Sequence, residues 1–324
     1  MTMVEEMLPS LADAERTAAL VRQAITSVIV GKDDIIETAL VVLLAEGHLL
    51  VEDVPGVGKT LLAKSLAKSI DCSVRRIQFT PDLLPSDITG VSVWNQERAD
   101  FEFRPGAVFA NVVIGDEINR ASPKTQSALL ESMEERQVTV DGTTYPLAPP
   151  FLVVATQNPI EMDGTYPLPE AQRDRFMARI AMGYPNHAAE LQMLETHSQA
   201  DPLDSMRAVT TIDGVRRAIA AVRGVYVAEP LRRYVLDLIE RTRSHPDLRL
   251  GASPRAGLQL VRASRALAAL RGRDHVLPDD VLALSAPVLS HRVMLSPEAR
   301  LARRDPAEVI ADVARSIPVP GMRR

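Results

Sequence analysis

The sequence predicts an α/β fold, in which a parallel sheet flanked by helices is followed by a second domain made only of helices. Three observations support this prediction. A buried strand, a glycine-rich turn and a helix follow one another between residues 47 and 69. Two short apolar runs, at 112–115 and 151–155, are typical of strands buried on both faces. From about residue 186 such runs disappear and helical periodicity takes over.

The N-terminal part of the chain predicts two helices and then the first strand. Between about Leu11 and Ala45 the apolar residues have helical spacing, and Gly31 marks a break between two helices. Residues 47–52 (GHLLVE) predict a buried strand, and residues 61–69 are good helix formers. A phosphate-binding loop requires this order of strand, loop and helix.

The middle of the chain predicts a helix and a hairpin. Residues 122–123 (Ser-Pro) are typical of an N-cap and a first helical turn, and the helix is expected to end near Arg136. Residues 137–140 and 143–145 flank the dipeptide Asp-Gly at 141–142, which favours a two-residue hairpin turn with positive φ. This hairpin is expected to project from the sheet.

The remainder of the chain predicts a compact bundle of amphipathic helices. We expect a nucleotide-binding core at residues 1–185 and a helical lid domain at residues 186–324. The predicted helices of the second domain lie at about 186–199, 212–223, 228–243, 253–271, 278–290 and 306–316.

Composition and charge exclude several classes of protein. The 324 residues are 46% apolar and 24% charged, as in soluble globular proteins. The net charge of −5 argues against a broad nucleic-acid-binding surface. Cys72 is the only cysteine, which fits a reducing compartment. The acidic N-terminus does not resemble a secretory signal, and the longest apolar stretch, 39–45, is far shorter than the roughly 20 residues that span a bilayer.

The strongest motif is the run DVPGVGKT at residues 53–60, which fits the pattern G-x-x-x-x-G-K-[ST] except that an aspartate replaces the first glycine. Gly56 and Gly58 allow backbone amides to turn toward the β-phosphate of a nucleotide. Lys59 is expected to reach the β- and γ-phosphates and Thr60 to bind Mg²⁺. The alternative is a chance surface turn, which the flanking strand and helix disfavour. The aspartate requires the loop entrance to be held in a different way.

An acidic pair, Asp116 and Glu117, ends the strand at 112–115. Asp116 is placed to contact Mg²⁺ through water, and Glu117 to act as the general base on the attacking water. Alone, the pair is weak support, because carboxylates at strand ends often cap the next turn. Its significance comes from its combination with the phosphate loop.

Four further polar residues are candidates with a structural alternative. Asn158 is suited to orient the hydrolytic water or the γ-phosphate, but a turn residue before a proline is the plainer interpretation. Arg173 and Arg175 are, by default, solvated surface charges or ion pairs. Arg255 stands in the first turn of a helix, where the dipole disfavours a cation and an anionic partner would compensate.

These motifs together resemble the AAA+ ATPases, and the sequences between them resemble the MoxR family in particular. The resemblance covers nearly the whole chain, from about Val28 to Pro320. It is carried by VEDVPGVGKT (51–60), QFTPD (78–82), FRPG (103–106), DEINRA (116–121), KTQ (124–126), ATQNP (155–159) and GASPR (251–255).

The resemblance implies roles for individual residues. Asn158 would be the first sensor, Arg175 the arginine finger that reaches the ATP of a neighbouring subunit, and Arg255 the second sensor, carried by the helical lid. An apolar residue is frequent in the family where this chain has Arg173, so the choice between Arg173 and Arg175 stays open. The bound species would be ATP with Mg²⁺, the latter held by Thr60 and Asp116. The nucleotide-binding residues would be Val30 and Gly31 at the adenine, with Pro55, Gly56, Val57, Gly58, Lys59, Thr60 and Leu61.

Two insertions of the family have counterparts here. The segment 91–102 would be the insertion in the second helix of the core, and the hairpin around 141–142 would precede the first sensor. Both would face the central pore of a ring.

Three functions are compatible with these residues. The first is a ring-forming ATPase that uses hydrolysis to remodel or mature other proteins. The second is a nucleotide-dependent switch or scaffold, which would use the same residues. The third, a nucleic-acid motor, is disfavoured because the segment 91–102 is more acidic than basic, although Trp94 would be able to stack on a base.

The resemblance also implies partners. A homo-hexamer, whose assembly would depend on ATP, is the usual state in the superfamily. A protein with a von Willebrand factor A domain and a protein client are the expected partners, and no nucleic acid is expected. We expect a cytoplasmic location without a transmembrane segment, with attachment to a membrane only through a partner.

Overall fold

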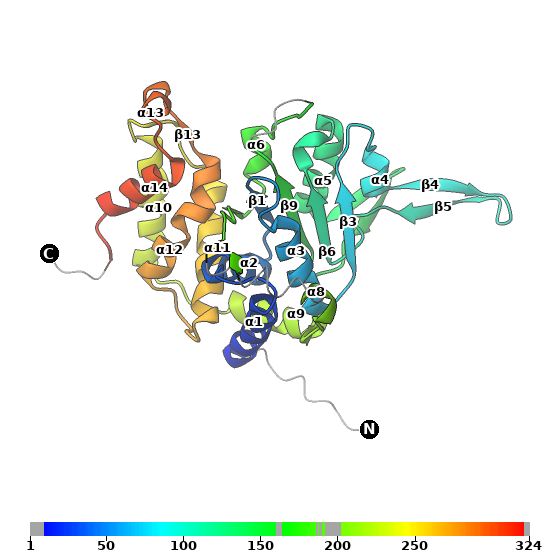
Figure 1. Cartoon of the computed structure of the whole chain (residues 1–324), viewed down its shortest axis with the longest axis horizontal. Helices are drawn as coiled ribbons and strands as arrows, with labels where there is room; N and C mark the ends of the chain where they lie inside the picture. The colour runs from blue at the N-terminus through cyan, green and yellow to red at the C-terminus, as the bar shows by residue number, and fades with distance from the viewer. Residues whose placement is uncertain (1–9, 160–163, 186, 188–189, 192–201, 321–324) are drawn as a thin grey trace.

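The computed structural model describes residues 10–159, 164–185, 187, 190–191 and 202–320. Its centre is a five-stranded parallel sheet in the order β10-β1-β9-β6-β3 (Figure 1). The α/β fold is confirmed, and three of the strands are those predicted from apolar runs. The strands are β1 (Leu49–Glu52), β3 (Val74–Gln78), β6 (Val112–Asp116), β9 (Leu152–Gln157) and β10 (Ala178–Ile180).

The two strands that apolar runs did not predict, β3 and β10, are the edges of the sheet. In β6 and β9 every residue is buried, whereas in β3 only Ile77 is. A central strand of a parallel sheet is covered on both faces and therefore needs a continuous apolar run, but an edge strand does not. The sequence Val-Arg-Arg-Ile-Gln of β3 consequently gives no strong strand signal.

Helices cover both faces of the sheet. Leu49 and Val51 point to one face and belong to a hydrophobic cluster with α1 (Leu11–Thr26), α2 (Asp33–Leu44) and α3 (Lys59–Lys68). Leu50, between them, belongs to the opposite cluster with α5 (Pro123–Glu135). This alternation follows from the two-residue period of a strand. The result is a sandwich of helix, sheet and helix, with the sheet inside.

Two antiparallel hairpins extend this core. The predicted insertion is the hairpin of β4 (Gly90–Asn95) and β5 (Asp100–Pro105), which follows the short helix α4 (Pro85–Thr89) and projects far from the sheet (Figure 1). The second hairpin, β7 (Gln137–Val140) and β8 (Thr143–Pro146), turns at Asp141 and Gly142, both with positive φ, as predicted.

The lid helices lie beside the core, against α1 and α2 (Figure 1). Residues of α1, α2, α9 and α11 share one hydrophobic cluster. The predicted helix at 186–199 lies largely outside the described residues, whereas the other five predicted helices are confirmed within two residues at each end. They are α9 (Ile212–Arg223), α10 (Glu229–Arg243), α11 (Pro254–Leu270), α12 (Pro278–Leu289) and α14 (Pro306–Ser316).

Short elements complete the chain. Two strand pairs of two or three residues occur beside the helices of the lid: β2 (Ile70–Asp71) with β11 (Thr210–Thr211), and β12 (Leu248–Leu250) with β13 (Met294–Leu295). No helix within the described part of the chain has the length and hydropathy to cross a bilayer. The remaining short helices are η1 (Ile118–Arg120), α6 (Glu170–Arg173), α8 (Pro202–Ser205), η2 (Ser290–Arg292) and α13 (Pro297–Leu301).

Candidate active site

The loop of residues 53–60 connects the carboxyl end of β1 to the amino end of α3, as the motif predicts. Gly56 and Gly58 have φ values of 86° and 90°, a conformation that residues with a side chain rarely adopt. Gly58 is also the N-cap of α3. The free amides at the first turn of α3 and the positive end of its dipole therefore face the loop, which is the geometry of an anion-binding site.

Asp53, at the position where the motif has glycine, holds the loop entrance. Its carboxylate accepts hydrogen bonds from the Val54 amide at 2.7 Å and from the Gly183 amide at 2.5 Å. These bonds connect the loop to the segment that follows β10. They are how the loop entrance is held in this chain, where an aspartate replaces the glycine of the motif.

The Lys59 ammonium group bonds to backbone carbonyls, namely those of Asp53 and, at 3.2 Å, Gln157. Burial lowers the pKa of Lys59, and the nearby carboxylates of Asp53 and Glu117 counteract this effect. A nucleotide phosphate would give the ammonium group an anionic partner in place of these carbonyls.

Thr60 and Asp116 meet at the carboxyl edge of the sheet. The Thr60 hydroxyl donates to Asp116 Oδ1 at 3.0 Å, and Arg76 Nε donates to Asp116 Oδ2 at 2.7 Å. Asp116 is only 3% exposed. Two hard oxygen donors side by side fit Mg²⁺, and the ion would take its other ligands from phosphate and water. Among the described residues no cluster of three or more acidic, histidine or cysteine side chains forms a metal site without such help.

Glu117 follows Asp116 in a left-handed backbone conformation, with φ of 59°. Such a conformation in a non-glycine residue is uncommon and is concentrated at functional sites. The Glu117 carboxylate accepts a hydrogen bond from Gln78 Nε2 at 3.0 Å and pairs with Arg120 at 3.3 Å. Its amide donates to the Thr156 hydroxyl at 3.0 Å. The carboxylate of the candidate base is therefore held by two side chains of the same chain.

Asn158 follows β9, which lies between β1 and β6. The strand order therefore places it between the phosphate loop and the acidic pair, although the three segments are far apart in the sequence. Asn158 is buried, and its carbonyl accepts a hydrogen bond from Asn119 at 3.3 Å. This position suits the sensor role that the family resemblance implies for Asn158.

A cavity of ≈ 220 Å³ adjoins the loop. Five predicted nucleotide-binding residues line it: Val30, Gly56, Val57, Gly58 and Leu61. Gly31 and Pro55 are not among its lining residues, whereas Lys59 and Thr60 lie in the adjoining first turn of α3. An apolar cavity beside a phosphate-binding loop suits the base and sugar of a nucleotide. The lining residues that sequence reasoning missed are Val28, Ile29, Lys32, Met182 and Pro185.

Arg175 and Arg255 are brought together elsewhere. Both pair with the carboxylate of Glu134, Arg175 at 3.2 Å and Arg255 at 2.5 Å. Met133, beside Glu134, accepts a hydrogen bond from the ring of His48, which directly precedes β1. Arg175 itself stands before the amino end of β10. The two arginines therefore lie at the amino edge of the sheet, opposite to the phosphate loop.

Comparisons with known proteins identify the family. Residues 48–178 match the model of the ATPase family associated with various cellular activities (AAA), and residues 240–313 match the AAA lid domain. The chain is 43% identical over 302 residues to chaperone MoxR1 of Mycobacterium tuberculosis, covering 90% of this chain and 80% of that protein. The chain belongs to the MoxR family of AAA+ ATPases.

Other relatives agree with this assignment. Identity is 48% over 299 residues to the uncharacterised protein YeaC of Bacillus subtilis, with 92% of this chain and 93% of YeaC covered. Identity is 34% to protein MoxR of Paracoccus denitrificans, with coverages of 92% and 94%. A solved structure of a candidate ATPase from Cytophaga hutchinsonii superposes with a TM-score of 0.88, at 38% identity and over 95% of this chain and 96% of that one.

In this MoxR-family chain the segment around the two candidate finger residues is clamped by Arg292, which no sequence motif indicated. Arg292 is 5% exposed and pairs with Asp174, between Arg173 and Arg175, at 2.8 Å. It also donates to the carbonyls of Asp174 and Phe176. Burial lowers the pKa of Arg292 to about 10, and Asp174 counteracts this effect. An arginine in an ordinary helical sequence gives no signal of such a role, because only the tertiary structure brings η2 to this turn.

Proposed function

We propose that the protein hydrolyses Mg-ATP in an oligomeric ring and uses the cycle to remodel or mature partner proteins. The observation that carries this proposal is the division of the candidate machinery between the two edges of the sheet. The phosphate loop, Asp116, Glu117 and Asn158 lie at the carboxyl edge, and Arg175 lies at the amino edge.

The carboxyl edge has the groups that one nucleotide requires. Loop amides and Lys59 would bind the phosphates, while Thr60 and Asp116 would hold Mg²⁺, which supplies charge neutralisation at the β- and γ-phosphate oxygens. Glu117 would remove a proton from the attacking water, and the Asn158 amide would orient that water. Each of these roles agrees with the positions described above.

Arg175 is too far away to complete the site of its own subunit. β1 has four residues, so its first and last residues are about 10 Å apart at the usual rise per residue. A positive charge on the opposite edge serves a nucleotide only if a second copy of the chain brings its amino edge to the first copy's carboxyl edge. We infer that Arg175 acts in trans, with Arg255 beside it. The lid arginine would then serve the neighbouring site, contrary to the simpler expectation of a lid that covers its own nucleotide.

The hairpins are suited to transmit the cycle to a client. Trp94 and Phe101, 50% and 65% exposed, form an edge-to-face pair 5.2 Å apart on the projecting hairpin β4–β5. Phe103 of the same hairpin stacks on Tyr145 of β8 at 4.0 Å, which joins the two hairpins. Exposed aromatic side chains are typical of protein contacts. We propose a hexameric ring with these hairpins at its pore and a partner that contains a von Willebrand factor A domain.

The test is steady-state ATP hydrolysis with Mg²⁺ as a function of protein concentration. A ring with an active site between subunits is expected to show a specific activity that rises cooperatively with concentration. The same specific activity in a dilute monomer and in an assembled ring would refute the trans arrangement. Analytical ultracentrifugation of the same samples identifies which species is present.

A nucleotide-dependent switch is the second candidate, and the contacts of Glu117 favour it. Gln78 and Arg120 hold its carboxylate in this structure, so a partner that releases it would control turnover. In a switch, the variant Glu117→Gln would keep its biological output in the ATP-bound state, whereas a motor would lose it. ATP binding without hydrolysis at any concentration would support the switch.

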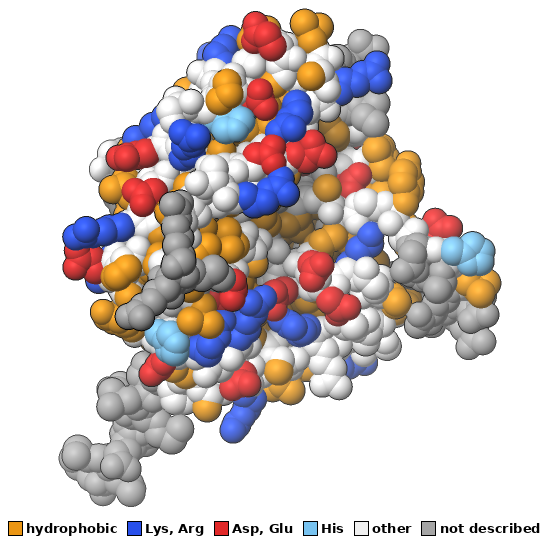
Figure 2. Space-filling view, turned by 90° about the vertical axis from the view of Figure 1, so that its left-hand side faces the viewer, with side chains coloured by type: hydrophobic (Ala, Val, Ile, Leu, Met, Phe, Trp, Pro, Cys, Tyr) orange, Lys and Arg blue, Asp and Glu red, His pale blue; other side chains and the backbone are white. Residues whose placement is uncertain are grey.

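A nucleic-acid motor has the least support. Figure 2 shows acidic and basic side chains interspersed over the described part of the face toward the lid, without a continuous basic surface there. Salt-sensitive binding to single-stranded DNA at physiological ionic strength would bring this function back into consideration.

A further inference from the structure

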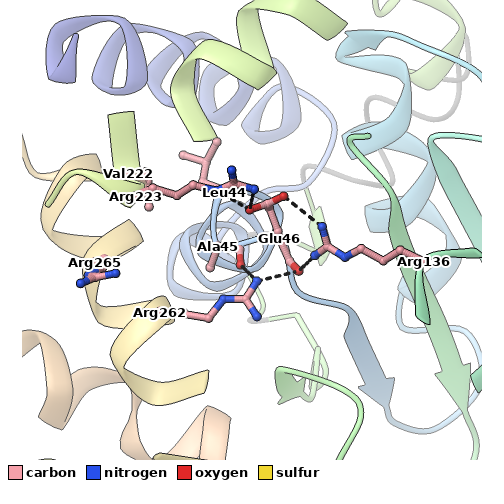
Figure 3. Close-up of a pocket in the computed structure, with 8 residues that line it drawn as sticks. All are labelled: Leu44, Ala45, Glu46, Arg136, Val222, Arg223, Arg262 and Arg265. Carbon is pink, nitrogen blue, oxygen red and sulfur yellow. Dashed lines mark hydrogen bonds and ion pairs between the residues drawn. The ribbon is translucent and has the colours of Figure 1, made fainter. Parts of the chain in front are cut away.

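A second cavity, of ≈ 400 Å³, lies where α2, α5, α9 and α11 meet (Figure 3). Glu46 in its wall precedes β1, so the cavity is at the amino edge of the sheet, away from the phosphate loop. Its charged lining is one carboxylate and four guanidinium groups, from Glu46, Arg136, Arg223, Arg262 and Arg265.

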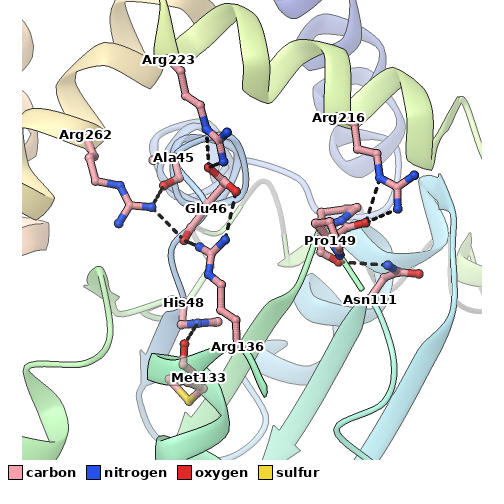
Figure 4. Close-up of polar contacts among 11 residues, drawn as sticks. Ala45, Glu46, His48, Asn111, Met133, Arg136, Pro149, Arg216, Arg223 and Arg262 are labelled. Atoms are coloured by element: carbon pink, nitrogen blue, oxygen red, sulfur yellow. Dashed lines mark hydrogen bonds and ion pairs between the residues drawn. The ribbon is translucent and has the colours of Figure 1, made fainter. Parts of the chain in front are cut away.

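Three of the arginines have bonds in this cavity (Figure 4). Arg136 donates to Glu46 Oε1 at 3.0 Å, and Arg223 donates to Glu46 Oε2 at 2.9 Å, so both carboxylate oxygens are engaged. Arg262 donates to the carbonyls of Ala45 at 2.6 Å and Glu46 at 3.2 Å. The cavity therefore has one negative side chain, Glu46, for four positive ones, and two of the arginines share its carboxylate.

Helix ends explain part of this excess. α2 ends at Leu44 and α9 at Arg223, and the negative ends of their dipoles attract cations. This accounts for Arg262, which caps the carbonyls at the end of α2. It does not account for Arg265. The Nε of Arg265 is buried without a hydrogen-bond partner, and no described residue bonds to its guanidinium group.

The arginines also act on one another. Burial, and after it the charge of Arg136, lowers the pKa of Arg262. Like charges held together in a partly buried cavity are costly, and a bound anion would relieve their repulsion. Guanidinium groups match tetrahedral phosphate oxygens through paired N–H donors better than any other side chain.

We propose that this cavity binds a small phosphate-bearing anion. The anion would supply the hydrogen-bond partner that the Arg265 guanidinium group lacks among the described residues. The cavity, of ≈ 400 Å³, is in the size range of small-ligand sites and is large enough for a di- or triphosphate group. Its walls come from α2 and the end of α5 in the core and from α9 and α11 of the lid. A bound anion would therefore fasten the lid to the core, whether or not the protein hydrolyses ATP.

The experiment is calorimetric titration of the full chain with inorganic tripolyphosphate at fixed ionic strength. The variant Lys59→Ala serves as the background, because it weakens phosphate binding at the phosphate loop. Adding Arg265→Gln is expected to weaken the remaining binding by about tenfold or more. The matched control is Arg233→Gln, which removes the same charge from an exposed pair with Glu229 on α10 and should leave binding unchanged.

A titration with ATP in place of tripolyphosphate distinguishes the sources of the anion. Binding of ATP that Arg265→Gln weakens assigns the cavity to the phosphates of a nucleotide. Binding of tripolyphosphate alone assigns it to a free oligophosphate. Either result supports the proposal.

Two results would overturn it. One is tripolyphosphate binding that is absent, or equally strong in Arg265→Gln and Arg233→Gln. The other is an Arg265→Gln variant whose only defect is the loss of assembly. This result would mean that carboxylates of a neighbouring subunit occupy the cavity. The thermal unfolding midpoint without anion verifies folding. If Arg265→Gln does not fold, Arg223→Gln, whose side chain is 67% exposed, gives the same test.

Discussion

The two edges of the parallel sheet present complementary chemistry. The carboxyl edge combines backbone amides with the side-chain oxygens of Thr60 and Asp116, a combination that suits a phosphate and its metal ion. The amino edge presents guanidinium groups, with Arg175 and Arg255 sharing one carboxylate. Within one subunit the sheet itself keeps the two apart. Each chain therefore has the two parts of the proposed active site on opposite edges, so that one chain alone would not complete it.

The largest expected effect comes from removing Arg175, the charge that we propose to act across subunits. If Arg175 is an arginine finger, Arg175→Ala is expected to lower kcat by about 10³-fold or more, with ATP binding retained. Arg173→Ala, the matched control two residues away, should retain most of the activity. Both are measured by steady-state hydrolysis of assembled protein. A large loss for Arg173 and none for Arg175 would exchange their roles.

The carboxyl edge is tested by Glu117→Gln, for which we expect a kcat lower by about 10²- to 10⁴-fold, the usual contribution of a general base. Mixing this variant with Arg175→Ala sharpens the comparison of the two edges. Each variant has the part that the other lacks, so mixed rings should regain activity at the junctions where the intact parts meet. Mixtures that stay inactive while the two variants co-assemble would place both residues in the same site.

The clamp at the amino edge is tested by Arg292→Met. Removing one partner of a buried ion pair leaves Asp174 unpaired and is expected to lower the free energy of unfolding by about 3–5 kcal/mol. Urea denaturation measures this change. The exposed pair Arg233–Glu229 is the control, and Arg233→Ala should cost at most about 1 kcal/mol. Equal effects of the two variants would mean that Arg292 does not act as a buried clamp.

The stability of the protein should also depend on pH through His48, which lies at the amino edge of the sheet. Its ring bonds to the Met133 carbonyl (Figure 4) and to the Val153 amide, and burial lowers its pKa to about 3. Because the unfolded chain then binds more protons between pH 3 and 6.5, stability falls as the pH falls through this window. We expect a loss of about 2 kcal/mol between pH 7.5 and pH 5 from this residue.

Urea denaturation at the two pH values measures the loss, and His48→Gln provides the comparison. That variant should be less stable at pH 7.5 but should show a smaller difference between the two pH values. An unchanged difference would show that His48 is not the group responsible.

The smallest expected effect is that of Asp53→Gly, which restores the glycine of the phosphate-loop motif. The exposed Gly183 amide loses a charged acceptor, so we expect a change of about 1 kcal/mol in ATP binding, or several-fold in Kd. Asp53→Asn keeps an acceptor and should change binding less. Fluorescent nucleotide titration measures both, and identical affinities would mean that the tie to residue 183 does not support the loop.

Most of the fold was predictable because its signals are local. The central strands β1, β6 and β9 are buried on both faces and therefore need apolar runs, and the five confirmed lid helices have clear amphipathic periodicity. The edge strands β3 and β10 were not predicted, because a strand at the edge of a sheet does not need a continuous apolar run. The domain boundary at residues 185 and 186 stays a prediction, since residues of the N-terminal and lid helices share one hydrophobic cluster.

The candidate site divides in the same way. Residues 53–60 and the acidic pair at 116–117 were identifiable as candidates because a phosphate loop, and an acidic pair at the end of a buried strand, are each recognised from residues close together in the sequence. The contacts at the amino edge could not be identified from the sequence. Glu134, Asp174, Arg255 and Arg292 come from four distant segments, and nothing in the neighbourhood of each one indicates its partner.

The sequence alone therefore determined the α/β class, the phosphate loop and the acidic pair, because backbone conformation and the order of strand, turn and helix are properties of short segments. Only the tertiary structure decided which arginines meet, which edge of the sheet they occupy and how four of them come to line one cavity with Glu46. Such contacts depend on the packing of segments up to about two hundred residues apart in the sequence. The charge of a residue does not indicate which distant residue it will contact.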